Sequence, residues 1–483
     1  MAMAVYNWFH SEVYFWRRLA SICWSVIFMP VVLMAFIFLS TFSAIHPFQW
    51  FSDSSVFFLN SRFWLAVLIN SICLVVLTMF TLPHFSVAAE VNKTVLSSNL
   101  ALFRWSRLPL LVASIETGAV AGWSLAWLIG DEYGTLTTVL NTETYESKVL
   151  NEPHVFLVLA ATFAGFCCYW MFFQQQQYYL SFPHVQRSKS FRVRYESMVL
   201  LHATCWQSIH VVKYFYIFYF MFGNLFKRWI SGSFGITTNP EVPPINSLLG
   251  IFNLSLLWQT YLCTFLLVFT TSLARTMTRV FYTEPTEFAM AAVLEQDKDI
   301  TLSEALACMS SPLLQHLAFL DLSCLSKFSH TRRQELLSLS QPGGHPRIWL
   351  SVSGVAFGVI RELNDLVKKE NGTIMSKVSV NAHKSSSQSS GFSHTLSGDT
   401  ASSLSHRVTG TESSEMLNSS EEEHKSSSFL AKSLSAVSSL PLISQILAEY
   451  PDTSSRSLFA SCQLQIWAIE AVSLVASKSL RED

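Results

Sequence analysis

Charged residues are scarce in this sequence. Lys, Arg, Asp and Glu make up 13% of its 483 residues, whereas soluble proteins carry roughly 25%. The net charge of −1 argues against the strongly basic surface that nucleic-acid-binding domains present. Because 50% of the residues are hydrophobic, much of the molecule must face something other than water.

Sequence motifs for catalysis and metal binding are also lacking. The nine cysteines form no CxxC pair with metal-ligand spacing, and several of them lie inside apolar runs. No Ser/His/Asp, Cys/His or paired-carboxylate arrangement is spaced for catalysis. We therefore predict buried cysteines without a disulfide framework, no metal, no cofactor, no small-molecule substrate and no enzymatic activity.

Long apolar runs, by contrast, are abundant. Six stretches come close to the roughly 20 residues that a helix needs to cross a bilayer. The fifth is the weakest of them, because His210 and Lys213 interrupt it. The six runs are residues 19–43, 63–82, 109–130, 154–174, 209–228 and 251–274.

The loops between these runs differ in charge. The loop at 131–153 is acidic, whereas basic residues collect in the loops on the other side. Since basic loops stay on the cytosolic side of a membrane, both termini are expected there. Omitting the fifth span would destroy this alternation, so we retain all six. The basic residues are Arg17, Arg18, Lys93, Arg104, Arg107, Arg187, Lys189, Arg192, Arg194, Arg275 and Arg279.

Ionisable residues within the spans raise the alternative of a transporter or channel of the endomembrane system. The candidates are Glu116 in the third span and His210 and Lys213 in the fifth. Glu116 and Lys213 could pair inside the bundle, but both lie near enough to span ends to reach the headgroups. No inverted repeat or matched pair of Gly/Pro-broken helices accompanies them. Transport is therefore the second hypothesis.

From about residue 280 the composition becomes that of a soluble helical protein. Thr301 with Glu304 forms one capping box and Thr331 with Gln334 forms another, and each predicts a helix start. Asn371-Gly372 is expected to end the last helix of this region. Two apolar stripes at helical spacing indicate helices that pack on one another. They are Leu313, Leu317, Leu320, Cys324 and Phe328 in one helix, and Val352, Ala356, Val359, Leu363 and Val367 in the other.

The string SQPGGHP separates two of these helices. A phosphate loop needs GxxxxGK[ST] after a strand, and His345 alone is a poor metal site. We interpret the string as a hinge. Pro342 would end one helix, Gly343 and Gly344 would supply unusual backbone angles, and Pro346 would open the next helix.

Beyond the hinge, the Ser-rich residues 374–439 are predicted to be disordered and open to phosphorylation. Helices are expected at 440–449 and about 455–478. The second would carry Phe459, Cys462, Ile466, Ile469 and Val472 on one face, with Trp467 beside them in the core or at a partner surface. Arg332, Arg333 and Arg347 could present a basic face to a partner or to anionic headgroups. The partner-binding or hinge candidates are Arg332, Arg333, Pro342, Gly343, Gly344, His345, Pro346, Trp349 and Trp467.

Three strings carry a resemblance to a known family. They are "IHPFQWFSDS" at 45–54, "RRQELLSLSQPGGHPRIW" at 332–349 and "LFASCQLQIWAIEAVSLVASKSLRED" at 458–483. Together they resemble segments of the Ndc-type (nuclear division cycle) transmembrane nucleoporins of the nuclear pore membrane. The similarity runs from the first span to the end of the chain. The family's linker is longer and further helices follow it, so we expect a C-terminally shortened form.

The resemblance implies a function. It implies a six-span anchor of the nuclear pore complex in the nuclear envelope, with both termini on the cytosolic or pore side. It further implies a soluble helical module that recruits other nucleoporins during pore assembly and nucleocytoplasmic transport. Those partners would include an Aladin-type WD-repeat protein and a membrane-binding nucleoporin with an RNA-recognition-like fold, besides the lipid bilayer.

The predicted fold class is therefore an all-α polytopic membrane protein. A cytosolic segment, residues 1–18, would precede the six-helix transmembrane domain at 19–275. A cytosolic helical domain at 276–373, the Ser-rich linker at 374–439 and a C-terminal helical segment at 440–483 would follow.

Overall fold

A computed structural model describes the chain as two compact units. It covers residues 2–42, 45–142, 145–183, 185–238, 245, 253–290, 300–339, 344–388 and 453–482. The first unit comprises Met1–Ala89, Ala101–Val355 and Glu470–Asp483, and the second comprises Glu90–Leu100 and Ala356–Ile469. The predicted helix at 440–449 and most of the predicted linker, from residue 389 onward, lie outside the described residues.

Helices dominate the described residues, as predicted, and six of those helices are long and apolar enough to cross a membrane. These six candidate spans are Val5–Ser40, Ser61–His84, Leu108–Ile129, Glu152–Gln174, Lys189–Phe234 and Leu254–Tyr282. The first is built from α1 (Ala2–Trp8), a π-helical turn (Phe9–Tyr14), α2 (Phe15–Ile27) and α3 (Met29–Ser40). The remaining five contain α5 (Ser61–Thr81), α7 (Leu108–Ile129), α8 (Glu152–Gln174), α9 (Lys189–Phe234) and α11 (Leu254–Tyr282).

Proline and asparagine explain several helix starts in the bundle. Proline occupies the first turn of α3, α7 and α8, where its missing N–H costs no hydrogen bond. The side chain of Asn60 accepts a hydrogen bond from the amide of Arg62 at the start of α5. Asn253 accepts one in the same way from Leu256 at the start of α11.

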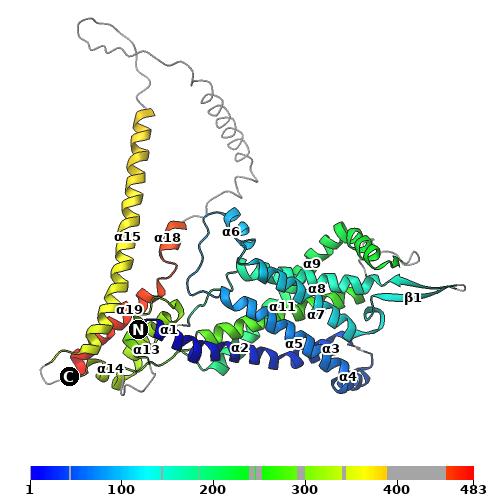
Figure 1. The fold of residues 1–483 in the computed structure, drawn as a ribbon, viewed down its shortest axis with the longest axis horizontal. Helices are drawn as coiled ribbons and strands as arrows, with labels where there is room; N and C mark the ends of the chain where they lie inside the picture. The colour runs from blue at the N-terminus through cyan, green and yellow to red at the C-terminus, as the bar shows by residue number, and fades with distance from the viewer. Residues whose placement is uncertain are drawn as a thin grey trace, which may run out of the picture. The chain divides into compact units, whose positions relative to one another are not determined.

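The spans pack side by side around α11, which contacts α2, α3, α8 and α9 (Figure 1). The closest pair is α7 with α8, where glycines remove the side chains between the two backbones. A Cβ on Gly118 would lie 2.4 Å from the carbonyl oxygen of Ala161, and one on Gly165 would lie 2.2 Å from that of Ser114. Small residues of this kind let membrane helices approach closely.

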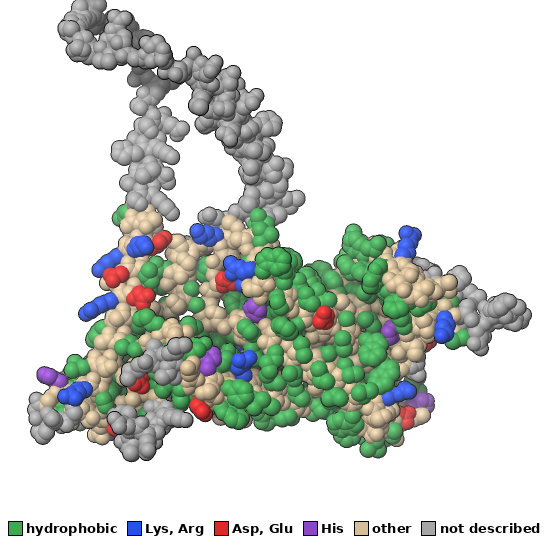
Figure 2. Space-filling model, viewed as in Figure 1, with side chains coloured by type: hydrophobic (Ala, Val, Ile, Leu, Met, Phe, Trp, Pro, Cys, Tyr) green, Lys and Arg blue, Asp and Glu red, His purple; other side chains and the backbone are tan. Residues whose placement is uncertain are grey.

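A buried polar contact joins two other spans. The side-chain amide of Asn70 in α5 donates to the hydroxyl of Ser124 in α7 and to the carbonyl of Ala66, at 2.8 Å each. Polar side chains hydrogen-bond across helices in this way where lipid offers no partner. Hydrophobic side chains cover most of the bundle face seen in Figure 2, as expected for a surface that faces acyl chains.

The two ends of the bundle differ in structure and charge. At one end, which we call the basic-loop end, Arg17 donates to the carbonyl of Tyr282 and Arg192 donates to the hydroxyl of Thr283. The helices α12 (Leu302–Leu306), α13 (Pro312–Phe328) and α14 (His330–Leu337) lie at the same end (Figure 1). At the opposite end, the acidic-loop end, lies α4 (Pro47–Val56).

A small sheet lies at the acidic-loop end of this otherwise helical bundle. The strand β1 (Thr137–Thr142) pairs antiparallel with β2 (Tyr145–Leu150), with Thr137 opposite Leu150. β3 (Thr237–Thr238) adds to β2 in parallel. Local sequence patterns did not indicate this sheet, because the hairpin is short and β3 comes from a loop that is distant along the chain.

The fifth span is much longer than the predicted 209–228. α9 has 46 residues, or about 69 Å at 1.5 Å per residue, against a hydrocarbon core of about 30 Å. Near its start, Arg192 donates to the hydroxyl of Thr283 at the basic-loop end. Near its other end, Lys227 forms an ion pair with Glu152 at the acidic-loop end. The part of α9 that crosses the bundle therefore lies between Arg192 and Lys227.

In the second half of the chain, α15 (Arg347–Gln388) and the pair α18 (Thr453–Leu458) and α19 (Gln463–Glu482) complete the described helices, apart from α6 (Val95–Leu102). The prediction that Asn371-Gly372 ends a helix is wrong, because α15 continues to Gln388. One glycine in a helix costs only about 1 kcal/mol, and good helix formers surround this one. All nine cysteines are free thiols, but Cys23 is exposed rather than buried.

Candidate functional site

The soluble helical module of the first unit is organised around α13. Buried residues occupy almost every position of this helix from Leu314 to Ser326, whereas Phe328, predicted to be part of its core stripe, is exposed. A helix buried on all sides is the centre of a domain rather than its surface. The Thr301 and Glu304 capping box is confirmed at the start of α12. The second capping box is wrong, because Ser329 caps α14 by accepting from Arg332.

A buried ion pair fixes α14 against α13. The Arg332 guanidinium donates to both carboxylate oxygens of Asp321, at 2.7 and 2.8 Å, and to the carbonyl of Phe288 at 2.8 Å. Asp321 is 3% exposed and also accepts from the amide of Phe288. These hydrogen bonds raise the pKa of Arg332. The predicted basic face is therefore incorrect for Arg332, since its charge is used inside the module.

The neighbouring arginine is also internal. Arg333 is buried and donates to the carbonyls of Leu325 and Ser326 in the last turn of α13. A cation at this position satisfies carbonyls that have no partner within the helix and favours the negative end of the helix dipole. Of the three arginines predicted to face a partner, only Arg347 is exposed.

The predicted hinge lies between two helices. α14 ends at Leu337 and α15 begins at Arg347. Gly344 and His345 are exposed and Pro346 is half-buried, whereas Pro342 and Gly343 lie outside the described residues. The carbonyl of Pro346 accepts from the amide of Leu350, so the proline opens the first turn of α15 as predicted.

The predicted apolar stripe of α15 lies on the buried face of the helix. Val352, Ala356 and Val359 are buried, and Leu363 and Val367 are partly buried. Trp349, the first aromatic residue of this helix, is half-buried.

The predicted face of α19 is the wrong one. Ile466 and Ile469 are 51% and 53% exposed, and Phe459 just before the helix is 49% exposed. The buried face instead contains Trp467, which is 6% exposed, together with Leu464, Ala468, Ala471 and Val475. Both faces are apolar, so helical periodicity could not distinguish them. The exposed stripe of Phe459, Ile466 and Ile469 remains as a candidate docking surface.

Within the first unit, the end of α19 is fastened to α13. Glu470 forms an ion pair with Lys327 at 2.6 Å and accepts from the hydroxyl of Ser323 at 3.0 Å. The Lys478 ammonium donates to the carbonyls of Ser326 and Lys327 at the C-terminus of α13. The chain therefore returns to the soluble module after the Ser-rich segment, a contact that spacing along the sequence could not indicate.

A histidine in α13 has an altered pKa. His316 is 3% exposed, and burial lowers its pKa to about 4, although the carbonyl of Pro312, 2.7 Å from Nδ1, acts in the opposite direction. Its ring stacks on Phe182, which belongs to the turn before α9. The histidine stays neutral at physiological pH and joins the soluble module to the membrane bundle.

The ionisable residues proposed for a transport path do not meet. Glu116 and Lys213 are both exposed on their helices, and the Lys213 ammonium lies over the ring of Tyr214. His210 is exposed as well. An ion pair between two spans was missed: Glu152 pairs with Lys227 and accepts from the hydroxyl of Tyr219. It lies at the acidic-loop end, where it connects α8 with α9.

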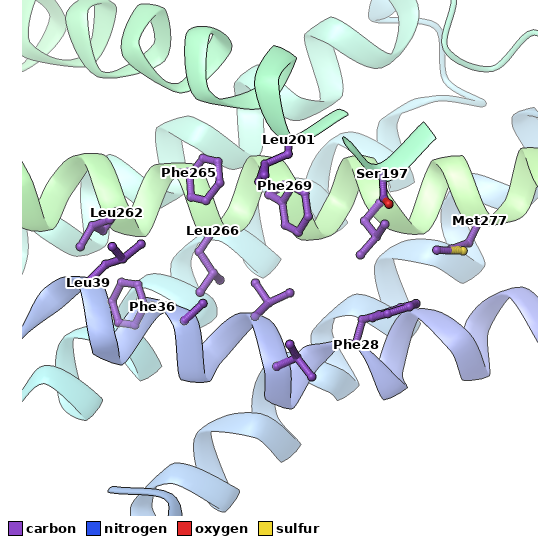
Figure 3. A pocket seen from close by; sticks show the side chains of 14 residues that line it. Phe28, Phe36, Leu39, Ser197, Leu201, Leu262, Phe265, Leu266, Phe269 and Met277 are labelled. Atoms are coloured by element: carbon purple, nitrogen blue, oxygen red, sulfur yellow. The ribbon is translucent and has the colours of Figure 1, made fainter. Parts of the chain in front are cut away.

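An apolar groove opens between α3, α9 and α11 (Figure 3). Its volume is about 280 Å³, and its walls are almost entirely aliphatic and aromatic. Phe36 and Leu39 line one side, and Leu266 and Phe269 line the other. The groove lies along spans, so hydrocarbon is the medium that surrounds it. No group of three His, Cys, Asp or Glu side chains within the described ranges could hold a metal ion.

Comparison with known proteins identifies the family. The sequence model of the nucleoporin protein Ndc1-Nup matches residues 13–483. The chain belongs to the Ndc1-Nup family of nucleoporins. The resemblance drawn from the three sequence strings is therefore confirmed, and the match extends through all six candidate spans and the soluble helices.

Individual relatives support the same assignment. The nucleoporin NDC1 of the mouse is 30% identical over 387 residues, which is 77% of this chain and 57% of the mouse protein. The NDC1 proteins of zebrafish and Xenopus laevis are 30% and 31% identical, over 81% and 72% of this chain. These matches cover 59% and 54% of the two relatives. The chain thus spans less than two thirds of the length of the relatives that it matches.

Proposed function

We propose that this chain is a transmembrane nucleoporin that anchors the nuclear pore complex in the nuclear envelope. The main support is that residues 13–483 match the sequence model of the Ndc1-Nup family. A bundle of six candidate spans supports the anchoring role. A helical module held together by an internal ion pair is consistent with a structural role.

Recruitment is the second part of this proposal. The soluble helices would dock other nucleoporins, including an Aladin-type WD-repeat protein and a membrane-binding nucleoporin with an RNA-recognition-like fold. The mechanism would be tethering, in which confinement at the membrane raises the effective concentration of weakly bound partners. The exposed stripe of Phe459, Ile466 and Ile469 is the docking surface that we would test first. The hinge at Gly343 and Gly344 remains a second candidate, since it would set the angle between two helices.

Imaging of the tagged chain against a nuclear pore marker tests the anchoring role. We expect punctate overlap at the nuclear rim and restored pore density in cells depleted of the endogenous family member. A diffuse signal throughout the endoplasmic reticulum would refute the anchoring role of this chain. Replacing both Glu116 and Lys213 by leucine should leave rim localisation unchanged, because neither side chain lies inside the bundle.

Affinity purification tests recruitment. The substitution Ile466→Glu introduces a charge into the exposed stripe, and we expect it to reduce recovery of the WD-repeat partner at least several-fold. Ser477→Glu is the matched control, since Ser477 is an exposed residue of the same helix about three turns beyond Ile466. Equal recovery with both variants would show that the stripe is not the docking surface.

A further inference from the structure

A polar cavity lies at the basic-loop end of the bundle, separate from the apolar groove. Its volume is about 440 Å³, within the roughly 300–1,000 Å³ of small-molecule sites. The walls come from the turn after α8, the first third of α9 and the last turns of α11. All three segments belong to the basic-loop end of the spans, the side on which we place the cytosolic headgroups.

Three guanidinium groups line this cavity. Arg192 comes from α9, and Arg275 and Arg279 come from α11, whereas Glu196 is the acidic residue in the same wall. Arg192 lies 3.5 Å from Glu196, which offsets one positive charge. Two positive charges therefore remain in a partly buried site, and burial between helices strengthens their attraction for an anion.

The arginines differ in how far the protein already uses them. Arg275 is 4% exposed and donates to Gln177 at 3.0 Å and to the carbonyl of Cys168 at 3.1 Å, so it forms a fixed floor. Arg279 donates from its Nη2 to the hydroxyl of Thr276 at 3.2 Å, but its Nε is buried and has no hydrogen-bond partner among the described residues. A buried donor without an acceptor is unfavourable, and a small shift of the Arg279 side chain, which lines the cavity, would bring this donor to an anion there.

The bilayer supplies such an anion at this depth. Arginine binds phosphate oxygens in a forked geometry with two parallel hydrogen bonds. A phosphate monoester carries a charge of roughly −1.5 to −2 at neutral pH, which balances the two positive charges, whereas a phosphodiester lipid carries less. Basic pockets between membrane helices on the cytosolic side are a recognised type of lipid site.

We propose that this cavity binds the headgroup of an anionic phospholipid that carries a phosphate monoester, such as phosphatidic acid or a phosphorylated phosphatidylinositol. Arg279 and Arg192 contact the phosphate, and Arg275 holds the floor of the site in place. The spans alone form this site, so lipid binding does not depend on the recruitment of partners.

Thermal stabilisation of the purified 483-residue chain in neutral detergent tests the proposal. The probes are dioctanoyl phosphatidic acid, dioctanoyl phosphatidylserine, dioctanoyl phosphatidylcholine and inorganic phosphate, each titrated separately. A ligand that binds the folded state raises the melting temperature in a saturable way. We expect phosphatidic acid to do so at concentrations at least about tenfold below the others. Equal stabilisation by phosphatidylserine or by inorganic phosphate would overturn the proposal.

Substitutions locate the site. Arg279→Gln and Arg192→Gln should each weaken phosphatidic acid binding by about tenfold or more, since each removes a charge-assisted hydrogen bond. Glu196→Gln should strengthen it several-fold, an increase that damage to the fold cannot produce. Arg194→Gln is the matched control, because Arg194 is exposed on α9 and does not line the cavity. The proposal fails if Arg194→Gln weakens phosphatidic acid binding as much as the cavity variants do, or if Glu196→Gln does not strengthen it. Either result would show that the lipid is attracted non-specifically by basic residues.

Discussion

The contact between α7 and α8 predicts that a single methyl group will destabilise the bundle. Replacing Gly165 by alanine adds a Cβ that would lie 2.2 Å from the carbonyl oxygen of Ser114 and 3.3 Å from the Cα of Gly118. Side-chain Cβ atoms essentially never approach other heavy atoms closer than 3.0 Å. The nearest obstacle is backbone, so no rotamer change can relieve the clash, and the two helices must separate by about 0.8 Å locally.

This separation sets the magnitude of the effect. A gap of roughly 0.5–1 Å forfeits a quarter to a half of the dispersion energy of the atoms that face it. Overpacking of a well-packed core typically costs about 1–3 kcal/mol. Alanine also improves helix propensity by about 1 kcal/mol, which offsets part of the loss. We therefore expect Gly165→Ala to lower the free energy of unfolding by up to about 2 kcal/mol, and Gly165→Val to lower it further.

Thermal unfolding in detergent, followed by size-exclusion chromatography of the remaining folded protein, measures this loss. Gly232→Ala is the matched control, because a Cβ at Gly232 in α9 meets no atom within 4 Å. That variant should be unchanged or slightly more stable. If Gly165→Ala melts together with Gly232→Ala, the close approach of α7 and α8 is refuted.

Two further predictions concern the soluble module. The pKa of His316 is about 4 in the folded protein against about 6.5 when unfolded, so its stabilising contribution is complete above pH 6.5 and is lost as the pH falls toward 4. That loss amounts to about 3 kcal/mol. Melting curves should therefore show a smaller acid destabilisation for His316→Gln than for the unsubstituted chain. Identical pH profiles of the two proteins would refute this role of His316. Arg332→Met should cost about 3–5 kcal/mol because it leaves the Asp321 carboxylate buried without its partner. The double variant Asp321→Leu with Arg332→Met should cost less than the two single variants combined, and additive losses in the same melting assay would show that the two groups do not interact.

Local sequence patterns predicted the helices of this protein well. The predicted runs of about 20 apolar residues overlap all six candidate spans, because each span must satisfy its backbone hydrogen bonds internally and present apolar side chains to lipid. The capping box of Thr301 and Glu304 was correct for a similar reason, since all its partners lie within one turn. Local rules were less successful at helix ends. α15 continues past Gly372, where an end was predicted, and Ser329 rather than Thr331 caps α14. A neighbouring residue or the rest of a helix can outweigh a single signal there.

The composition and periodicity of the sequence thus determined the class of the protein: a membrane chain with six apolar helices, a soluble helical part and a family resemblance in three short strings. Only the tertiary structure decided which residues meet. It placed Arg332 against Asp321 inside the soluble module, turned Trp467 rather than Ile466 toward the core, and gathered Arg192 and Arg279 around one cavity. The physical reason is that charge, hydropathy and periodicity are properties of a segment. The partner that uses a side chain comes from a distant segment, which only packing brings near.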